Sequence, residues 1–384
     1  MRSAFARRST EMRPFLAMEV MERAIEMERK GEAVIHLELG EPDFPAHPAA
    51  APACIRALEA GWTHYTDSRG LAELREAIAD DTRRRFGVAV EADRVIVSNG
   101  TSPAMLLVFS LLVGEGDEVV LATPHYPCYP NFIRLAGGIP VLIATDPRSG
   151  YALDVDAVRR ALTPRTRAIV VSSPANPTGA VQSEPTLRGL AALGVPIISD
   201  EIYDGLLYDG AKVTSALAVS EDAYVLDGFS KRYAMTGYRL GYAIVPRAAV
   251  RAIQVMQQSL FISANCFVQH AGVAVLRDRS DALERMLASY TKRRRLLIDG
   301  LRALGFGVPV EPKGAFYVFA DARAFDSDSL RLAFALLERA KVGTTPGVDF
   351  GAAGEGWLRF SYANSEAAIE AALERMAAAL PSLR

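Results

Sequence analysis

The feature that most constrains the fold is an alternation of short apolar runs with helical segments, which begins near Arg94. Most of these runs are rich in β-branched residues and apolar on both alternations, which is typical of strands buried on both faces of a mostly parallel sheet. The runs are RVIVS (94–98), EVVLA (118–122), PVLIA (140–144), AIVVSS (168–173), PIISDEI (196–202), YVLDGF (224–229) and GYAIV (241–245). Helical patterns lie between several of them, at about 101–113, 129–136 and 184–193. This βαβ order predicts an α/β sandwich.

The texture of the sequence changes after about residue 275. A charged helical pattern at 281–304 is followed by an apolar run at 314–319 and a second helical pattern at 328–340. A second apolar run at 357–362 and a helical pattern at the C-terminus complete the sequence. This order predicts a smaller α+β domain. The N-terminal segment reads as an amphipathic helix, and its apolar side is expected to pack with that domain. We therefore expect a large domain over 46–275 and a small domain made of 1–45 and 276–384, and the 384 residues suffice for two cores.

Charge and composition exclude several classes of function. The net charge is −2, so no broad basic surface for nucleic acid or membranes is expected. The three cysteines are far apart and the five histidines show no ligand spacing, which argues against disulfides and against a metal site. No apolar run reaches the ~18 residues of a membrane-spanning helix, and the N-terminus lacks the apolar core of a signal peptide. These features favour a cytoplasmic protein.

Polar residues follow the apolar runs, at the edge of a parallel sheet where ligands gather. Gly100, Thr101 and Ser102 follow the first run and open a helix, which makes a suitable seat for a phosphate. A plain helix cap is the commoner meaning of such residues when they stand alone. Tyr126 and Tyr129 lie among prolines after the second run, where a stiff loop could present a flat ring or simply form a turn.

Three further strand ends carry polar residues of distinct chemistry. Asn176 stands between two prolines that restrict its backbone, although Asn-Pro also initiates ordinary turns. Asp200 follows the run PIIS, where a buried carboxylate needs a partner: a ligand or a structural ion pair. Lys231 follows YVLDGF in an aromatic setting, unlike a surface lysine, and Arg239 lies 239 − 231 = 8 residues later.

Taken together, these residues match a single ligand. They offer phosphate anchors, a stacking ring, a hydrogen-bonding amide, a carboxylate for a cationic ring nitrogen, and an amine for an aldehyde. Pyridoxal 5′-phosphate (PLP) has all the complementary groups, so we predict that it is the cofactor.

With these residues in place, the chain resembles the class I/II aminotransferases of PLP fold type I, the aspartate aminotransferase-like superfamily. The motifs that carry the resemblance run in the family's order and span nearly the whole chain. They are LGEPDF (39–44), HYTDSRGLAELREAIA (64–79), SNGTS (98–102), PHYPCYP (124–130), SSPANPTGAV (172–181), SDEIYDGLLY (199–208), GFSKRYAMTGYRLGY (228–242), KGAFYVF (313–319) and LRFSYANS (358–365). The resemblance implies an α/β/α large domain with a mostly parallel sheet and a smaller α+β domain.

The resemblance also implies roles for residues around the cofactor ring. Lys231 is similar to the lysine that forms the internal aldimine and then shuttles the α-proton. Asp200 is similar to the carboxylate that pairs with the ring nitrogen. Tyr203 and Asn176 correspond to the residues that hydrogen-bond the ring hydroxyl oxygen, and Tyr126 to the residue that stacks on the ring.

Further positions are implied to bind the phosphate and the substrate. The phosphate set consists of Gly100, Thr101, Ser102, Arg239 and Tyr65, with Ser230 in place of the hydroxyl that many relatives carry at the position of Gly228. Tyr65 is similar to the tyrosine that reaches the site of a neighbouring subunit, which implies a homodimer with shared active sites. Arg359 is similar to the arginine that clamps the substrate α-carboxylate, helped by Asn176 and the backbone at Gly40.

The predicted function is transamination from an L-amino acid to a 2-oxo acid such as 2-oxoglutarate. No residue is assigned as a second cation for a distal carboxylate, and Phe261, Ile262 and Phe267 favour a donor with an apolar or aromatic side chain. The alternatives are an aspartate aminotransferase, a PLP-dependent C–S β-lyase of the same fold, and a PLP-sensing regulatory module. The last is disfavoured because the chain has no helix-turn-helix segment or basic arm.

Overall fold

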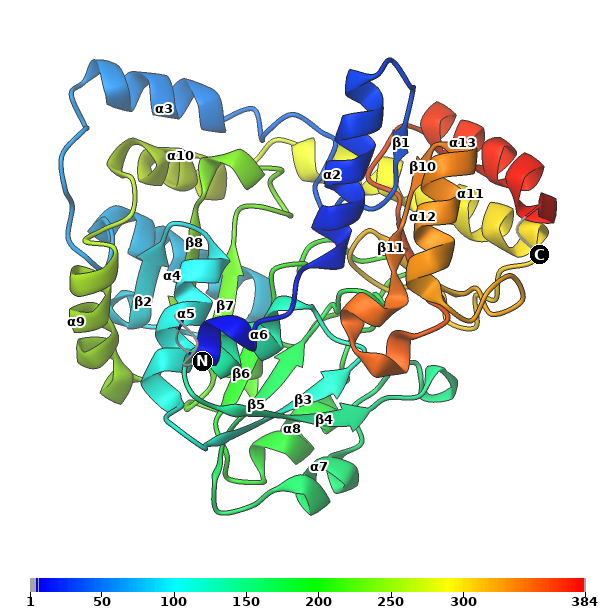
Figure 1. Ribbon diagram of the computed structural model, residues 1–384. Helices are drawn as coiled ribbons and strands as arrows, with labels where there is room; N and C mark the ends of the chain where they lie inside the picture. The colour runs from blue at the N-terminus through cyan, green and yellow to red at the C-terminus, as the bar shows by residue number, and fades with distance from the viewer. Residues whose placement is uncertain (1–4, 6, 383–384) are drawn as a thin grey trace.

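A seven-stranded sheet organises the larger part of the chain in the computed structural model, which describes residue 5 and residues 7–382 (Figure 1). All seven predicted apolar runs become strands of this sheet. In spatial order they are β2 (Val95–Ser98), β8 (Gly241–Ile244), β7 (Tyr224–Gly228), β6 (Ile197–Asp200), β5 (Thr166–Ser172), β3 (Glu118–Thr123) and β4 (Ile139–Ala144). The strands from β7 to β4 pair in parallel, whereas β8 is antiparallel to both of its neighbours.

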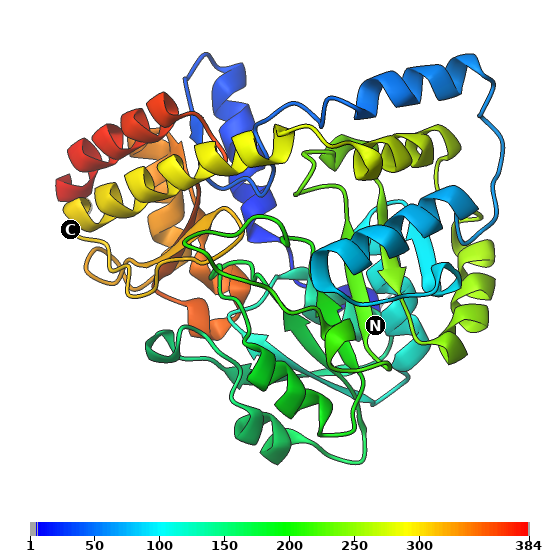
Figure 2. The same cartoon turned by 180° about the vertical axis from the view of Figure 1, so that it is seen from behind.

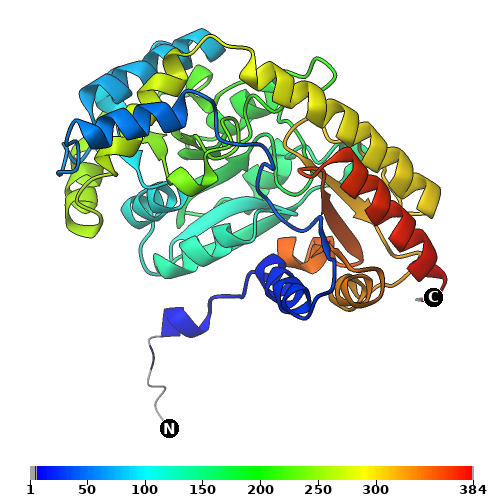
Figure 3. The same cartoon turned by 90° about the horizontal axis from the view of Figure 1, so that it is seen from above.

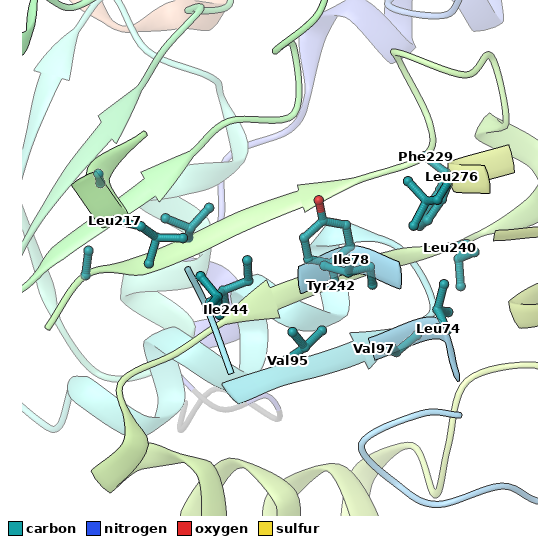
Figure 4. Close-up of a cluster of buried hydrophobic side chains, with 14 of the residues drawn as sticks. Leu74, Ile78, Val95, Val97, Leu217, Phe229, Leu240, Tyr242, Ile244 and Leu276 are labelled. Carbon is teal, nitrogen blue, oxygen red and sulfur yellow. The ribbon is translucent and has the colours of Figure 1, made fainter. Parts of the chain in front are cut away.

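Helices cover both faces of the sheet. One face packs on α3 (Ala50–Glu59), α4 (Ala72–Phe86), α7 (Val155–Ala161), α8 (Glu184–Ala191) and α10 (Cys266–Arg277). The other packs on α5 (Thr101–Leu112), α6 (Cys128–Leu135) and α9 (Val250–Leu260). Alternate residues of each strand enter opposite cores: Val95 and Val97 of β2 join the first core and Ile96 the second. Figure 4 shows the first core, where the side chains of β2 and β8 gather with Leu74 and Ile78 of α4. The predicted α/β/α sandwich is therefore confirmed.

The strand β4 departs from the expected burial on both faces. Ile139 and Leu142 each expose 45% of their surface, although the run is as apolar as its neighbours. The reason is position, because β4 is the last strand of the sheet and pairs with β3 alone.

A second core lies beside the sandwich, in the C-terminal part of the chain. The helix α11 (Ala282–Leu304) runs alongside α13 (Glu366–Ala379), as Figure 2 shows from behind. These helices and α12 (Ser329–Ala340) enclose a small antiparallel sheet of β11 (Thr345–Pro346), β12 (Trp357–Ser361) and β9 (Tyr317–Asp321). The side chains of Tyr203 and Leu206 also enter this core. The domain boundaries at 45/46 and 275/276 stay a prediction.

The N-terminal segment packs on the second core. After α1 (Arg7–Thr10), helix α2 (Leu16–Arg29) buries Val20, Ala24 and Met27 against Leu337 of α12 (Figure 3). The short strand β1 (Ile35–His36) then pairs in parallel with β10 (Val342–Gly343). The expectation that the amphipathic helix joins the smaller part is thus met.

Two further expectations concern the environment of the chain. None of the helices within residues 7–382 is long and apolar enough to cross a membrane. Cys54, Cys128 and Cys266 are free thiols. The cytoplasmic location stays a prediction.

Candidate active site

A cavity of about 480 Å³ opens at the edge of the sheet where the parallel strands end, and Ala17, Met18 and Met21 of helix α2 line it. The first turn of α5 and the loops after β3, β5, β6 and β7 all reach it. These loops meet because parallel strands end at one edge, and antiparallel β8 begins at that same edge. The predicted residues that line the cavity are Gly40, Thr101, Ser102, Tyr126, Asn176, Asp200, Tyr203, Ser230, Lys231, Arg239 and Arg359.

Lys231 lies three residues beyond the end of β7, and its amine points into the site. The Nζ atom donates a hydrogen bond to the carbonyl oxygen of Gly40 at 2.6 Å. Burial lowers the pKa of Lys231 to about 8, helped by the positive charges of Arg239 and Arg359. A partly neutral amine at physiological pH can act as a nucleophile or a base.

Asp200 is the last residue of β6 and is almost completely buried. Its Oδ2 accepts a hydrogen bond from the hydroxyl of Tyr129 at 2.6 Å, and its Oδ1 accepts one from the backbone N–H of Ile202 at 3.2 Å. Burial nevertheless raises the pKa of this carboxyl to about 6. No Lys or Arg side chain forms an ion pair with Asp200 within the described residues. The site therefore holds a buried carboxylate that a cationic ligand group would stabilise.

The N-terminus of α5 and Arg239 form the basic end of the cavity. Gly100 has a φ of 96°, and a Cβ there would lie 2.6 Å from Nη2 of Arg239, so the backbone closely approaches this guanidinium. The Nη1 of Arg239 is held by the carbonyl oxygen of Thr236 at 2.9 Å. Backbone N–H groups at a helix start and an adjacent arginine make a seat for a phosphate.

The absence of a side chain at Gly228 has a steric cause. Gly228 faces Gly241 across the β7–β8 ladder. A Cβ at Gly228 would lie 2.9 Å from the Cα of Gly241 and 3.0 Å from the carbonyl oxygen of Leu240. Ser230, two residues on, is the buried hydroxyl that lines the cavity here.

Arg359 also lines the cavity and is buried in the middle of β12. Its Nη1 donates to Oδ1 of Asn176 at 3.0 Å, and its Nη2 donates to the backbone oxygen of Glu38 at 2.5 Å. The guanidinium also lies 4.2 Å from the ring centroid of Tyr317. Its Nε has no acceptor within the described residues. A fixed guanidinium with free donor capacity suits a flat carboxylate.

Several residues of the site were not assigned from the sequence. Tyr129 contacts Asp200, and the hydroxyl of Tyr317 lies 2.8 Å from that of Tyr203. The backbone oxygen of Glu38, in the segment after β1, and the hydroxyl of Thr345 on β11 hold Arg359. Tyr129 stood in the proline-rich loop beside Tyr126 and Tyr317 stood within KGAFYVF, but neither pattern reveals which hydroxyl faces the site.

Other sequence expectations fall outside the cavity of this chain. Tyr65 is 83% exposed and does not line it. Phe261, Ile262 and Phe267 do not line it either: Phe261 and Phe267 pack against the two cores of the sandwich, and Ile262 is exposed. The apolar lining comes from α2 and the segments on either side of it, through Phe15, Met18, Met21 and Leu39. The inference of an apolar pocket from Phe261, Ile262 and Phe267 was therefore wrong for this subunit.

The residues present fit PLP at each of its functional groups. The basic end suits a phosphate, the buried Asp200 carboxylate suits a protonated ring nitrogen, and the Lys231 amine suits an aldehyde. A three-layer α/β/α fold with this set at the strand ends defines a PLP-dependent transferase of fold type I.

The comparisons with known proteins give the family. The model of the family "aminotransferase class I and II" matches residues 32–376. The chain is 39% identical to an aspartate/prephenate aminotransferase of Thermus thermophilus over 98% of both chains. It is also 39% identical to a valine–pyruvate aminotransferase of Mycobacterium tuberculosis, over 96% of this chain and 97% of the other. A solved aspartate aminotransferase from Thermus thermophilus, with maleate, superimposes with a TM-score of 0.94 at 39% identity, covering 99% of this chain and 100% of that one. The chain belongs to the class I and II aminotransferases and is a PLP-dependent enzyme.

Proposed function

We propose that the enzyme transfers an amino group from an L-amino acid with an apolar or aromatic side chain to a 2-oxo acid such as 2-oxoglutarate. The observation that carries the proposal is that the cavity lining is divided between three cations and an apolar wall. The cations that line it are Lys231, Arg239 and Arg359, and cofactor aldehyde, phosphate and substrate α-carboxylate account for all three. The rest of the wall toward α2 is supplied by Phe15, Met18, Met21, Leu39 and Met105.

The proposed roles follow from the position of each side chain. PLP, when bound, supplies an aldehyde for amines and a ring that withdraws electrons from the substrate Cα. Arg359 binds the substrate carboxylate, with Asn176 and the Gly40 backbone beside it, and so fixes the direction of the Cα proton. Lys231 takes that proton and returns it, because its pKa of about 8 lets it hold or release a proton near neutral pH.

The remaining predicted residues would hold the cofactor itself. Asp200 would pair with the ring nitrogen, and its charge would favour the protonated ring. Tyr203 and Asn176 would supply polar atoms for the ring hydroxyl, and the ring of Tyr126 would stack on the cofactor. The proposed phosphate set is Gly100, Thr101, Ser102, Ser230 and Arg239, with Tyr65 of a second subunit.

An aspartate donor is the second candidate, because several of the relatives are named for aspartate. Relatives named for aspartate/prephenate and for valine–pyruvate have the same 39% identity to this chain, so family membership alone does not select the substrate. A distal carboxylate needs a cation or several donors in a site closed from water. The lining within the described residues provides no fourth Lys or Arg for it.

A donor panel separates these candidates. The holoenzyme would be assayed with leucine, phenylalanine, alanine and aspartate, each against 2-oxoglutarate and against pyruvate. We expect kcat/KM for leucine or phenylalanine to exceed that for aspartate by about tenfold or more, which corresponds to about 1.4 kcal/mol of transition-state binding. If aspartate is the best donor, the apolar assignment is wrong. If keto acid and thiol appear from a C–S substrate without an acceptor, the enzyme is a β-lyase.

The role of Lys231 has a direct test. Lys231→Ala should lose both transamination and the covalent attachment of PLP that borohydride reduction traps in the wild-type enzyme. Lys313→Ala is the matched control, because Lys313 is a half-exposed lysine paired with Asp209. Covalent PLP in Lys231→Ala would contradict the assignment.

We further propose a homodimer whose active sites are shared. An apolar surface on α3 and the loop after it exposes Ile55, Leu58, Trp62 and Tyr65, at 45% to 83% of their surface. A patch of large apolar side chains is typical of an interface. If a second copy of the chain covered this surface, Tyr65 would reach the phosphate site of that copy, whereas it does not reach the site of its own chain.

Subunit mixing tests the shared site. Lys231→Ala and Tyr65→Phe place their defects on the two sides of the same site, so a mixed dimer contains one site with both residues intact. Refolding or exchanging the two inactive or impaired variants together should restore activity above that of either alone. Unchanged activity in mixtures that ultracentrifugation shows to be dimeric would contradict a contribution from Tyr65 across the interface.

A further inference from the structure

The segment that follows β1 carries the carboxylate clamp of the cavity. Leu37 donates its N–H to the carbonyl of Gly343 at 3.0 Å, and its own carbonyl accepts from Ser361 at 2.7 Å. The next carbonyl, that of Glu38, accepts from Nη2 of Arg359 at 2.5 Å and from the hydroxyl of Thr345 at 3.2 Å. The direction of the Arg359 guanidinium therefore depends on where this segment lies.

The side chain of Glu38 is completely buried beneath the clamp. Its Oε1 lies 2.5 Å from Nδ1 of His36, and its Oε2 has no hydrogen-bond partner within the described residues. Opposite it stands Gly343, where a Cβ would collide with that carboxylate. A buried carboxylate is costly unless it is paired, and His36 is the partner that the described residues provide.

His36 also reaches the helix that borders the cavity. Its Nε2 lies 3.2 Å from Oε1 of Glu28 on α2, the helix that places Met18 and Met21 in the cavity wall. The hydrogen bond to Glu38 raises the pKa of His36 to about 9, so the ring is a cation at neutral pH.

The other charged groups near this ring have partners of their own. On the β10 side the residue paired with His36 is Gly343, which carries no charge, and Lys341 forms an ion pair with Glu32. From the C-terminal side Asn364 donates to the backbone oxygen of His36, and Arg375 of α13 is bound to the carbonyl of Ala33. Glu28 and Glu38 are thus the acids that His36 bridges.

We propose that His36 is a positioning residue for substrate binding: as a cation between Glu38 and Glu28 it fixes the segment after β1 that orients Arg359 and ties that segment to helix α2. This inference rests on the proposed function, in which Arg359 binds the carboxylate of donor and acceptor. His36 touches neither cofactor nor substrate, so its effect should appear in carboxylate binding and not in the chemical step.

The test uses the PLP-loaded enzyme and 3-phenylpropionate, which has a carboxylate but no amino group to react. His36→Gln leaves Glu38 buried without a cation, and we expect a five- to twentyfold weaker Kd for 3-phenylpropionate. KM for the best donor should rise by a similar factor while kcat changes less than twofold. The double variant His36→Gln/Glu38→Gln removes both charges and should recover a Kd within about twofold of wild type. Glu32→Gln, which removes an acid near the same helix end, is the control and should bind normally.

The pH dependence gives an independent readout. The folded pKa of His36 is raised, so the contribution of the ion pair is complete below the ordinary pKa near 6.5 and is lost as the pH rises through about 9. Over that interval the affinity of the wild type for 3-phenylpropionate should fall more than that of His36→Gln. The comparison isolates His36, because the other titrating groups are the same in both proteins.

The outcomes separate the two proposals. A wild-type enzyme that transaminates normally, together with a His36→Gln variant of unchanged Kd and KM, overturns the positioning role alone. A double variant that stays as weak as His36→Gln also overturns it, because the effect would then not run through Glu38. A wild-type holoenzyme that binds no carboxylate and transaminates no amino acid overturns the proposed function and this inference with it.

Discussion

The hydroxyl of Tyr129 lies 2.6 Å from Oδ2 of Asp200, and this is the strongest contact of the buried carboxylate beneath the cavity. Tyr129 lies in the first turn of α6, which the loop after β3 places against the end of β6. Burial raises the pKa of Asp200 to about 6, and the hydrogen bond from Tyr129 opposes that rise. The phenol therefore helps to keep Asp200 ionised at neutral pH, the state that a cationic ring nitrogen requires.

Tyr129→Phe should weaken cofactor binding, and more so in acid. Without the phenolic donor the pKa of Asp200 rises further, so a larger share of the carboxyl is protonated at pH 6 than at pH 8. A hydrogen bond to a charged group contributes about 1.5–3 kcal/mol, so PLP affinity should fall roughly tenfold or more at pH 6. Fluorescence titration of the apoenzyme with PLP at both pH values measures this. Tyr224→Phe, far from the site on β7, is the control, and an equal loss at both pH values would contradict the explanation.

Arg359→Lys should impair both half-reactions through substrate binding. Lysine keeps the charge but cannot bind Asn176, Glu38 and a flat carboxylate with the same fork of donors. Losing one charge-assisted hydrogen bond costs about 1.5–3 kcal/mol, so kcat/KM should fall roughly 10- to 100-fold. Steady-state kinetics with donor and acceptor would show the loss mainly in KM. Arg323 forms an ion pair with Asp321 at the surface, and Arg323→Lys is the control, which should leave kcat and KM unchanged.

Gly228→Ser should not improve the phosphate site, although many relatives carry a hydroxyl there. The new Cβ would meet the backbone of Gly241 and Leu240, which cannot yield as a side chain can. Overpacking of this kind costs about 1–3 kcal/mol. We expect a lower thermal midpoint and faster loss of PLP on dialysis. Gly237→Ser is the matched control, because a Cβ there meets nothing within 4 Å. A Gly228→Ser enzyme of higher stability and affinity would refute the steric account.

The sequence predicted the strands and the residues at their ends because both depend on local pattern. Lys231, Asp200, Asn176 and Arg239 each follow or precede an apolar run, and parallel pairing brings such positions to one edge. The contacts of Tyr129 and Glu38 could not be predicted in this way. They depend on which side of a turn faces the site, and on elements more than 70 residues away in the chain.

The apolar wall of the cavity also could not be predicted from local sequence pattern. Phe261, Ile262 and Phe267 form the more conspicuous apolar cluster in the sequence, yet Phe261 and Phe267 pack against the cores of the sandwich and Ile262 is exposed. Met18 and Met21 reach the cavity because of the position of α2, which its packing on α12 and its other tertiary contacts set. Tertiary packing, which no local pattern records, decides this part of the site.

Glu201→Gln should stabilise the protein increasingly as the pH rises. Oε1 of Glu201 accepts three hydrogen bonds, from Ser199, Ser215 and Ala216, while Oε2 has no partner within the described residues. Burial raises the pKa of Glu201 from 4.5 to about 8. Between these values the folded carboxyl keeps a proton that the unfolded chain releases, so the free energy of unfolding falls as the pH rises, and it levels off above 8.

The variant lacks this titration. The stability difference in its favour should grow by roughly 2 kcal/mol between pH 6 and pH 8, since each pH unit corresponds to about 1.4 kcal/mol. Urea unfolding of the holoenzyme at both pH values measures it. Glu184→Gln, in an exposed pair with Arg188, should show no such trend. A difference that stays constant with pH would mean that Glu201 is ionised in the folded enzyme.

Met18→Arg should shift the donor preference toward dicarboxylic amino acids. Met18 lines the cavity from α2 but exposes 42% of its surface, so the long arginine side chain can keep its charge in contact with water. The substitution adds a cation to a wall that supplies apolar groups in the wild type. We expect kcat/KM for aspartate to rise relative to leucine by roughly tenfold, or about 1.4 kcal/mol. Met18→Gln, of similar length but neutral, separates the effect of charge from the loss of the thioether. If Met18→Gln and Met18→Arg change the aspartate-to-leucine ratio equally, the side chain at position 18 does not face the distal end of the substrate, and the apolar wall must select the donor through other residues of α2.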